Sequence, residues 1–167
     1  MTSEAKQDAI KLLTEDHRTV EALFERFEKA EDGEKEQIAK SICTELKVHA
    51  MLEEEIFYPA LRGKIEDDDL DEAMVEHDGA KLLINEIEAG SSEDQFYDAK
   101  VKVLQEQIEH HVKEEEKQQG NIFTQARKAD VDLEALGEQM ATRKAELMQL
   151  AETQGLPPAE TATMETA

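Results

Sequence analysis

Apolar side chains recur at alternating steps of three and four residues along most of this chain. This spacing lines them up on one face of an α-helix. In the first stretch, about residues 4–30, these positions are Ile10, Leu13, Val20, Phe24 and Phe27. Asp32-Gly33 then breaks the pattern, as a turn does. The chain therefore begins with a long predicted amphipathic helix.

The same spacing predicts four further helices. Gly63 follows the second and Gly90 follows the third, and glycine is typical of a helix end. Ser92-Glu-Asp-Gln95 has the form of a capping box and predicts the start of the fourth helix. The predicted ranges are about 34–61, 69–89, from the capping box to about 122, and 132–153.

The fourth pattern contains an interruption. Gln118-Gln-Gly-Asn121 places poor helix formers directly before Ile122-Phe123, whereas the second pattern passes straight from Glu55 to Ile56-Phe57. The additional residues amount to about one helical turn. We therefore expect a kink or a local unwinding at this point.

These elements predict an all-α fold, an up-and-down four-helix bundle over residues 1–130. The fifth helix, within residues 131–154, is expected to pack across the bundle as an accessory element. Residues 155–167 have no hydrophobic periodicity and are expected to form a disordered tail. A length of 167 residues fits one domain. An aromatic content of 4% with 36% charged residues fits helices whose outer faces are solvated.

Polar side chains occupy some positions of the apolar faces. Each of the four bundle helices has a histidine on this face: His17, His49, His77 and His111. In the second and fourth helices a glutamate follows four residues later, Glu53 and Glu115, so that both side chains lie on the same side, one turn apart. His110 is rotated by about 100° from its neighbour, and we therefore predict that His111 faces inward.

Together these six residues predict a metal site. A single histidine on an apolar face is more often a hydrogen-bonded core residue, and each glutamate lies in an acidic run where one member can fall in phase by chance. An ionised glutamate in the core is nevertheless unfavourable unless it is paired or binds a metal. Imidazoles and bridging carboxylates suit a pair of first-row transition metals inside a bundle, with coordination positions left open for a small ligand.

Two neighbouring residues have alternative roles. Glu21, one turn after the first histidine, either accepts a hydrogen bond that orients it or pairs with Arg18 or Arg26. Lys81, one turn after the third histidine, cannot bind a metal while protonated. It either lines the pocket or reaches toward the acidic surface.

Four motifs resemble the bacterial hemerythrin-like proteins of the HHE cation-binding family. They are Asp16-His-Arg-Thr-Val-Glu-Ala-Leu-Phe24, His49-Ala-Met-Leu-Glu-Glu-Glu-Ile-Phe-Tyr-Pro59, Glu76-His-Asp-Gly-Ala-Lys-Leu-Leu-Ile84 and His110-His-Val-Lys-Glu-Glu-Glu116. The resemblance covers about residues 10–130. It implies a non-haem centre of two iron ions, oxo- or hydroxo-bridged, with the four inward histidines as terminal ligands and Glu53 and Glu115 as bridging carboxylates. Oxygen-carrying hemerythrins have a further histidine where this chain has Lys81, which argues against simple reversible oxygen carriage.

Composition narrows the choice of partners. The formal net charge is −22, and such a surface repels phosphate backbones and anionic lipids. We expect neither nucleic acid nor a membrane as partner, and a monomer or weak dimer. The N-terminus lacks the apolar run of a signal peptide, so a cytoplasmic location is expected. Cys43, the single cysteine, lies within a helical pattern and is expected to be a partly buried structural thiol.

Three classes of function are compatible with this pattern. The first is a di-iron protein that binds or processes O2, H2O2 or NO; its first candidate activity is peroxide decomposition, with Glu21 or another carboxylate as proton relay. The second is a non-enzymatic module that senses or stores oxygen, nitric oxide or iron. The third is a structural bundle without a metal.

Overall fold

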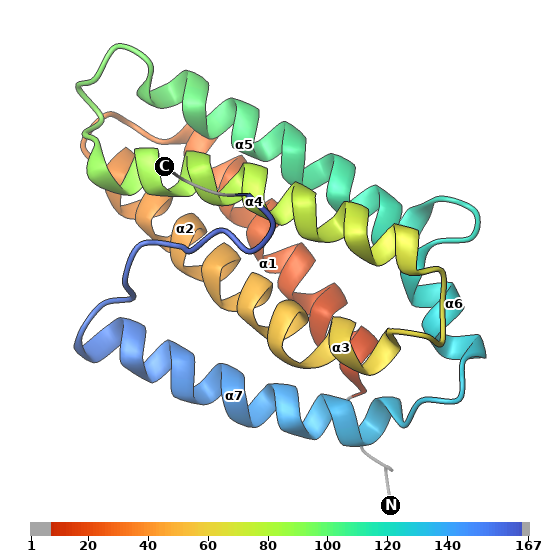
Figure 1. Cartoon of the computed structure of the whole chain (residues 1–167). Helices are drawn as coiled ribbons and strands as arrows, with labels where there is room; N and C mark the ends of the chain where they lie inside the picture. Colours follow the sequence, from red (N-terminus) through yellow and green to blue (C-terminus); the bar gives the residue numbers. More distant parts are fainter. Residues whose placement is uncertain (1–7, 165–167) are drawn as a thin grey trace, which may run out of the picture.

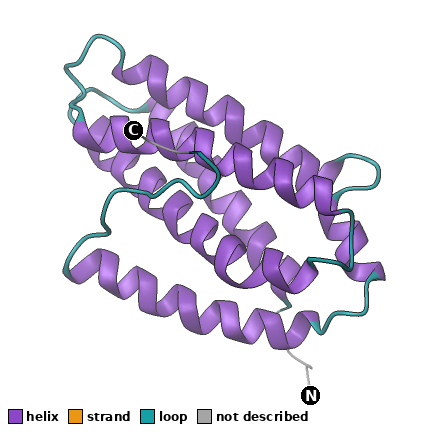
Figure 2. Cartoon of the chain, viewed as in Figure 1, coloured by secondary structure: helices purple, strands orange, loops and turns teal. Residues whose placement is uncertain are grey.

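A computed structural model describes residues 8–164, which fold into helices joined by loops, with no strand among them (Figures 1 and 2). Four long helices run alternately up and down: α1 (Ala9–Lys29), α2 (Lys35–Leu52), α4 (Asp67–Ala89) and α5 (Tyr97–Val112). The predicted all-α bundle is confirmed. None of the helices in the described part of the chain combines the length and apolar content that a membrane crossing needs.

Local interactions at the helix ends follow from the sequence. Asp8 begins α1 by accepting a hydrogen bond from the Lys11 amide at 2.8 Å. The predicted capping box before α5 does not form, because the amide of Ser92 donates to Glu36 at 2.8 Å and the helix begins only at Tyr97.

Two π-helical turns interrupt the second and fourth arms of the bundle at matching places. The turn η1 (Glu53–Phe57) continues α2 and leads into α3 (Tyr58–Leu61), and η2 (Lys113–Lys117) continues α5. A π-helical turn is wider than an α-helical one, and such turns are frequent at functional sites. Each one begins within one turn after an inward-facing histidine.

The expected interruption of the fourth arm is confirmed. Beyond Lys117 the chain leaves the helix, and Gly120 adopts a positive φ of 72°, which glycine tolerates best. Asn121 then caps α6 (Ile122–Lys128) by accepting a hydrogen bond from the Thr124 amide at 2.9 Å. This turn directs Phe123 back into the core, where it is buried.

The core consists of two apolar clusters. One surrounds the first turns of α1 and includes Phe57, Phe123 and Met140, the last from α7 (Leu133–Thr153). The other lies at the opposite end of the bundle and includes Phe24 and Ile84. Along α1, α2 and α4 the inward-facing histidine falls between members of the two clusters, and on α5 it lies beyond Leu104, a member of the second. α7 packs against α1 and α2 along one side of the bundle (Figure 1).

The segment after α7 differs from the disordered tail expected for residues 155–167. Residues 155–164, which we call the C-terminal strap, run as an extended segment across α2 and α4 (Figure 1); residues 165–167 lie outside the described part. The strap has no buried apolar stripe; instead, Lys47, Lys81 and Asn85 donate hydrogen bonds to its carbonyls, and Asp78 accepts hydrogen bonds from its amides.

Candidate metal centre

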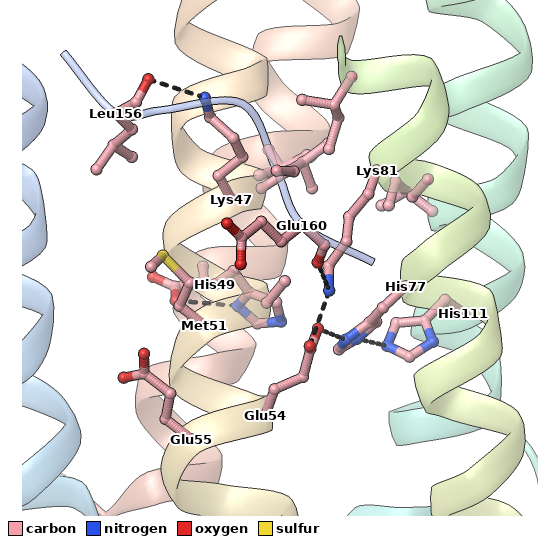
Figure 3. Close-up of a pocket in the computed structure, with 18 of the residues that line it drawn as sticks. Lys47, His49, Met51, Glu54, Glu55, His77, Lys81, His111, Leu156 and Glu160 are labelled. Carbon is pink, nitrogen blue, oxygen red and sulfur yellow. Dashed lines mark hydrogen bonds and ion pairs between the residues drawn. The ribbon is translucent and has the colours of Figure 1, made fainter. Parts of the chain in front are cut away.

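The four long helices bring the six predicted residues together between the two apolar clusters. His17, His49, His77 and His111 project inward from α1, α2, α4 and α5, and Glu53 and Glu115 lie in the two π-helical turns. All six are buried, and both glutamates are 0% exposed. Figure 3 shows His49, His77 and His111 facing one another across the bundle.

The nitrogen and carboxylate atoms of these residues converge. Glu53 Oε1 lies 3.0 Å from His49 Nε2 and 3.2 Å from His77 Nε2. Glu115 Oε1 lies 2.7 Å from His111 Nε2 and 3.6 Å from His17 Nε2. Two triads, His17/His49/Glu115 and Glu53/His77/His111, each place their ligand atoms within 4.8 Å of one another.

Several of these buried atoms lie close to one another but make no well-directed hydrogen bond. Among the described residues, they include Nε2 of His17 and His49, both carboxylate oxygens of Glu53, and Oε1 of Glu115. A buried polar atom without a partner is costly, and five of them facing a common space fit a cation-binding cluster. The donor set of imidazole nitrogens and carboxylate oxygens suits first-row transition metals.

The outer nitrogen of each histidine contacts a carboxylate from another helix. His49 Nδ1 lies 3.0 Å from Asp16, His77 Nδ1 lies 2.8 Å from Glu54, His111 Nδ1 lies 2.8 Å from Glu76, and His17 Nδ1 lies 3.2 Å from Glu116. Such contacts fix the orientation of a ligand imidazole and raise its basicity. Sequence reasoning missed these four acids, although each is the direct neighbour of a predicted ligand.

Glu21 is not the acceptor for His17. It forms an ion pair with Arg18, at 2.7 and 2.6 Å, which was the alternative interpretation. Arg18 also contacts Glu116, the residue that does reach His17. The side chain of Glu21 is 37% exposed and pairs with the arginine of the same helix at the surface.

Lys81 lines the cavity that adjoins the inward histidines, and it is almost fully buried. Its ammonium group lies 2.8 Å from Glu54 and thereby holds the carboxylate that contacts His77 (Figure 3). The lysine therefore contacts the candidate centre through Glu54.

Tyr58 contributes an oxygen that sequence reasoning did not assign. Its hydroxyl donates to Glu115 at 3.2 Å and lies 3.4 Å from His111 Nε2, and its ring stacks on His77. In an uninterrupted α-helix Tyr58 would lie about 140° around the axis from Glu53. The wider π-helical turn rotates it toward the same space, and the sequence carries no clear signal of that turn.

The neighbouring histidine lies outside the cluster, as its helical phase predicted. His110 has a 61% exposed side chain, and its Nε2 lies 2.9 Å from Glu114 and 3.2 Å from Glu76. Burial and the nearby Glu76 and Glu72 raise the pKa of Glu114 to about 7. These groups form a half-exposed acidic surface outside the buried centre.

Burial and the carboxylates act in opposite directions on the buried imidazoles. Burial by itself lowers the pKa of His49, but the charge of Glu53 and the hydrogen bond to Asp16 outweigh it, and the pKa rises to about 10. At His17 burial dominates and the pKa falls. Burial would raise the pKa of Glu53, yet the charge of His49 holds it well below its usual range. Because a metal binds imidazole only in its deprotonated form, cation binding and protonation of these histidines would compete.

Comparison with known proteins agrees with this geometry. The family model of the hemerythrin HHE cation binding domain matches residues 8–120. The chain belongs to this family. All six converging residues lie within the matched range of the hemerythrin HHE domain, and its buried histidine and glutamate clusters suit a metal centre.

A solved structure shares the fold. The hemerythrin HHE cation binding domain-containing protein from Mycobacterium kansasii superposes with a TM-score of 0.73 at 22% identity, covering 89% of this chain and 94% of that protein. A protein named DNA nickase from Nostoc sp. is 31% identical over 111 residues, which are 66% of this chain. This hemerythrin HHE chain spans only 31% of that protein's length.

Proposed function

We propose that this chain is a non-haem di-iron protein that binds or processes a small oxidant, namely O2, H2O2 or NO. In this proposal His17, His49, His77 and His111 would hold two iron ions through their imidazoles, and Glu53 and Glu115 would supply the carboxylates shared between them. The proposal is supported above all by the buried atoms of these side chains that face a common space without hydrogen bonds. Iron bound by these residues would supply one-electron redox chemistry.

The side chains around the centre have three tasks in this proposal. Asp16, Glu54, Glu76 and Glu116 fix the imidazoles in the tautomer that presents Nε2 to the ions. Lys81 balances the charge of Glu54 and keeps it against His77. Phe57 and Phe123 form part of the apolar cluster next to the centre, which excludes water on that side.

We further propose that Tyr58 is an additional oxygen ligand. Its hydroxyl lies among His77, His111 and Glu115 at 3.2–3.5 Å, which is hydrogen-bond distance and leaves the oxygen facing the same space. Oxygen-carrying hemerythrins have an additional histidine at the position of Lys81. In this proposal the phenol oxygen of Tyr58 would replace that missing ligand.

The decisive experiment measures metal content, absorption and turnover on the same sample. We expect about two irons per chain, oxo-to-iron charge-transfer bands that disappear on reduction, and release of oxygen from peroxide over many turnovers per iron. Iron with ligand binding but without turnover would favour the non-enzymatic sensing or storage alternative. A stable protein with no iron would refute the di-iron proposal and favour a structural bundle.

The nickase activity named for the Nostoc protein is not extended to this chain. A net charge of −22 opposes a phosphate backbone, and the chain spans less than a third of that protein. We propose neither nucleic acid nor a membrane surface as partner, and we place the protein in the cytoplasm as a monomer or weak dimer.

A further inference from the structure

A cavity of about 320 Å³ opens beside the histidines of the candidate metal centre. His17, His49, His77 and His111 all line it, so the cavity adjoins the space between the candidate metal ligands. The wall toward the far end of the bundle is apolar, with Val20, Leu46, Ala80, Ile84 and Ile108 from all four long helices. A diatomic gas or a peroxide needs far less space, whereas pockets for organic ligands start at about 300 Å³.

The C-terminal strap forms the roof of this cavity. Leu156, Pro157, Pro158, Ala159 and Glu160 all line it, and Figure 3 shows the strap passing over the space between α2 and α4. The ammonium of Lys47 lies 3.0 Å from the Pro157 carbonyl, and that of Lys81 lies 2.9 Å from the Glu160 carbonyl. The roof is therefore attached from both sides of the opening.

Two polar side chains of α4 fasten the strap more firmly. Asn85 donates to the carbonyl of Ala159 at 2.9 Å and accepts from its amide at 2.8 Å. The buried carboxylate of Asp78 accepts from the amides of Ala162, Thr163 and Met164 at 2.6–3.0 Å. A carboxylate with three backbone donors is a strong anchor, and it lies beyond the part of the strap that covers the cavity.

Three charged groups at the edge of the cavity are paired within the protein. Lys47 lies 2.7 Å from Glu88, Lys81 lies 2.8 Å from Glu54, and Asp16 lies 2.5 Å from Lys144. A charged ligand that used one of these three groups would have to break its ion pair. An uncharged apolar ligand gains from the apolar wall without doing so.

We propose that this cavity binds an uncharged, mainly apolar organic molecule beside the metal-site histidines, and that the C-terminal strap is its lid. A cavity of roughly 150 Å³ already holds benzene, so this one accommodates a molecule of about twice that size. Contact between this ligand and bound iron rests on the proposed function. Binding of the ligand in the cavity does not.

The cavity is tested with the neutral fluorescent probe N-phenyl-1-naphthylamine. The full chain is expected to bind it saturably at one site. Ala80→Phe fills the cavity from α4 and Ile108→Trp fills it from α5; both are expected to weaken binding about tenfold or more, since a pocket that is filled offers no apolar surface. Ala89→Phe, an equal enlargement at an exposed position of α4, keeps wild-type affinity. No saturable binding by the full chain, or unchanged affinity in both filled variants, would overturn the proposal.

The lid is tested with two truncations. Deletion of residues 161–167 removes the contacts to Asp78 but keeps the residues that line the roof, whereas deletion of 165–167 keeps both. In stopped-flow measurements we expect the probe to leave the first variant roughly tenfold faster than the second, the equivalent of one or two lost hydrogen bonds. Equal dissociation rates would show that the strap is no lid.

Iron analysis of the same samples separates this proposal from the proposed function. Probe binding by a chain that contains no iron would refute the di-iron function and support the cavity. A chain that contains two irons and binds no probe would support the di-iron function and refute the cavity proposal.

Discussion

At the scale of single residues, the candidate centre is built as a ring. Each of the four bundle arms supplies an inward histidine and an acid next to a predicted ligand in the sequence. Asp16 of the first arm contacts the histidine of the second, and in the same order Glu54, Glu76 and Glu116 contact those of the third, fourth and first. Each imidazole is therefore oriented by a different arm, so the centre requires that all four arms are in place.

Substitution of His111 and of His110 should have opposite outcomes. His111→Ala removes a buried nitrogen of one triad and is expected to lose most of the bound iron, whereas His110→Ala, at an exposed position, keeps it. Metal analysis of both purified variants is the measurement. Iron loss in the His110 variant alone would mean that the centre lies on the other face of α5.

Tyr58→Phe should keep the metal but change its spectrum. The ring remains stacked on His77 while the hydroxyl near Glu115 is lost. If the phenol oxygen is a ligand, the variant loses a visible phenolate-to-iron band and retains about two irons per chain. An identical oxidised spectrum in both proteins would remove Tyr58 from the ligand set.

The thiol of Cys43 should be inert in the folded protein. Burial raises its pKa to about 12, with a further contribution from Glu88, and only the thiolate is reactive. Because the folded-state pKa is raised, the thiol stays protonated throughout pH 7–9. Labelling with a thiol reagent should therefore be slow in buffer and fast in denaturant, and fast labelling of the native protein would contradict the burial of this residue.

At the scale of elements, the helices could be predicted from the sequence but their interruptions only in part. The long helices each bury one stripe, so their phase selected His17, His49, His77 and His111 correctly as inward residues. The π-helical turns could not be predicted, because Glu53–Phe57 has the composition of an ordinary helical turn. The contacts between the histidine Nδ1 atoms and the four neighbouring carboxylates depend on which helices pack together, and periodicity does not reveal that packing.

The C-terminal strap shows the same limit more clearly. Its order derives from Asp78 and Asn85, which lie on α4 and whose partners are backbone groups more than 70 residues away. A sequence pattern records side chains that face the core. Hydrophobic periodicity does not reveal hydrogen bonds between polar side chains and a backbone segment that is distant in the sequence. For this reason the sequence predicted a disordered tail.

Asn121→Ala tests the short helix that follows the interruption. Asn121 accepts from the Thr124 amide at 2.9 Å and donates to the Gln118 carbonyl at 2.8 Å, and loss of an N-cap costs about 1 kcal/mol. Chemical unfolding should therefore show a free energy of unfolding lower by about that amount. Thr142→Ala, at an exposed position of α7, serves as the control, and equal losses in both variants would exclude a capping role.

At the scale of the whole molecule, polar ligands separate two apolar clusters. The bundle is held at both ends by apolar packing, while its middle contains six buried polar side chains whose charges and unpaired atoms oppose folding. The free energy of unfolding therefore depends on whether a bound cation compensates the charges and unpaired atoms of these six side chains.

Removal of bound metal should lower the melting temperature. A ligand at about 100 times its Kd stabilises the folded state by about 2.7 kcal/mol, which corresponds to roughly 5–10 °C for a protein of this size. Thermal unfolding followed by circular dichroism, before and after chelation and after re-addition of ferrous iron, is the measurement. The same midpoint in all three samples is the outcome expected of a metal-free structural bundle.

The position of the strap also has a consequence for biosynthesis. All six converging side chains lie between residues 17 and 115, whereas residues 155–164 are translated after them. A nascent chain therefore presents an uncovered bundle before its roof has left the ribosome. The order of synthesis would therefore give the proposed ions access from this side until the last segment packs against α4.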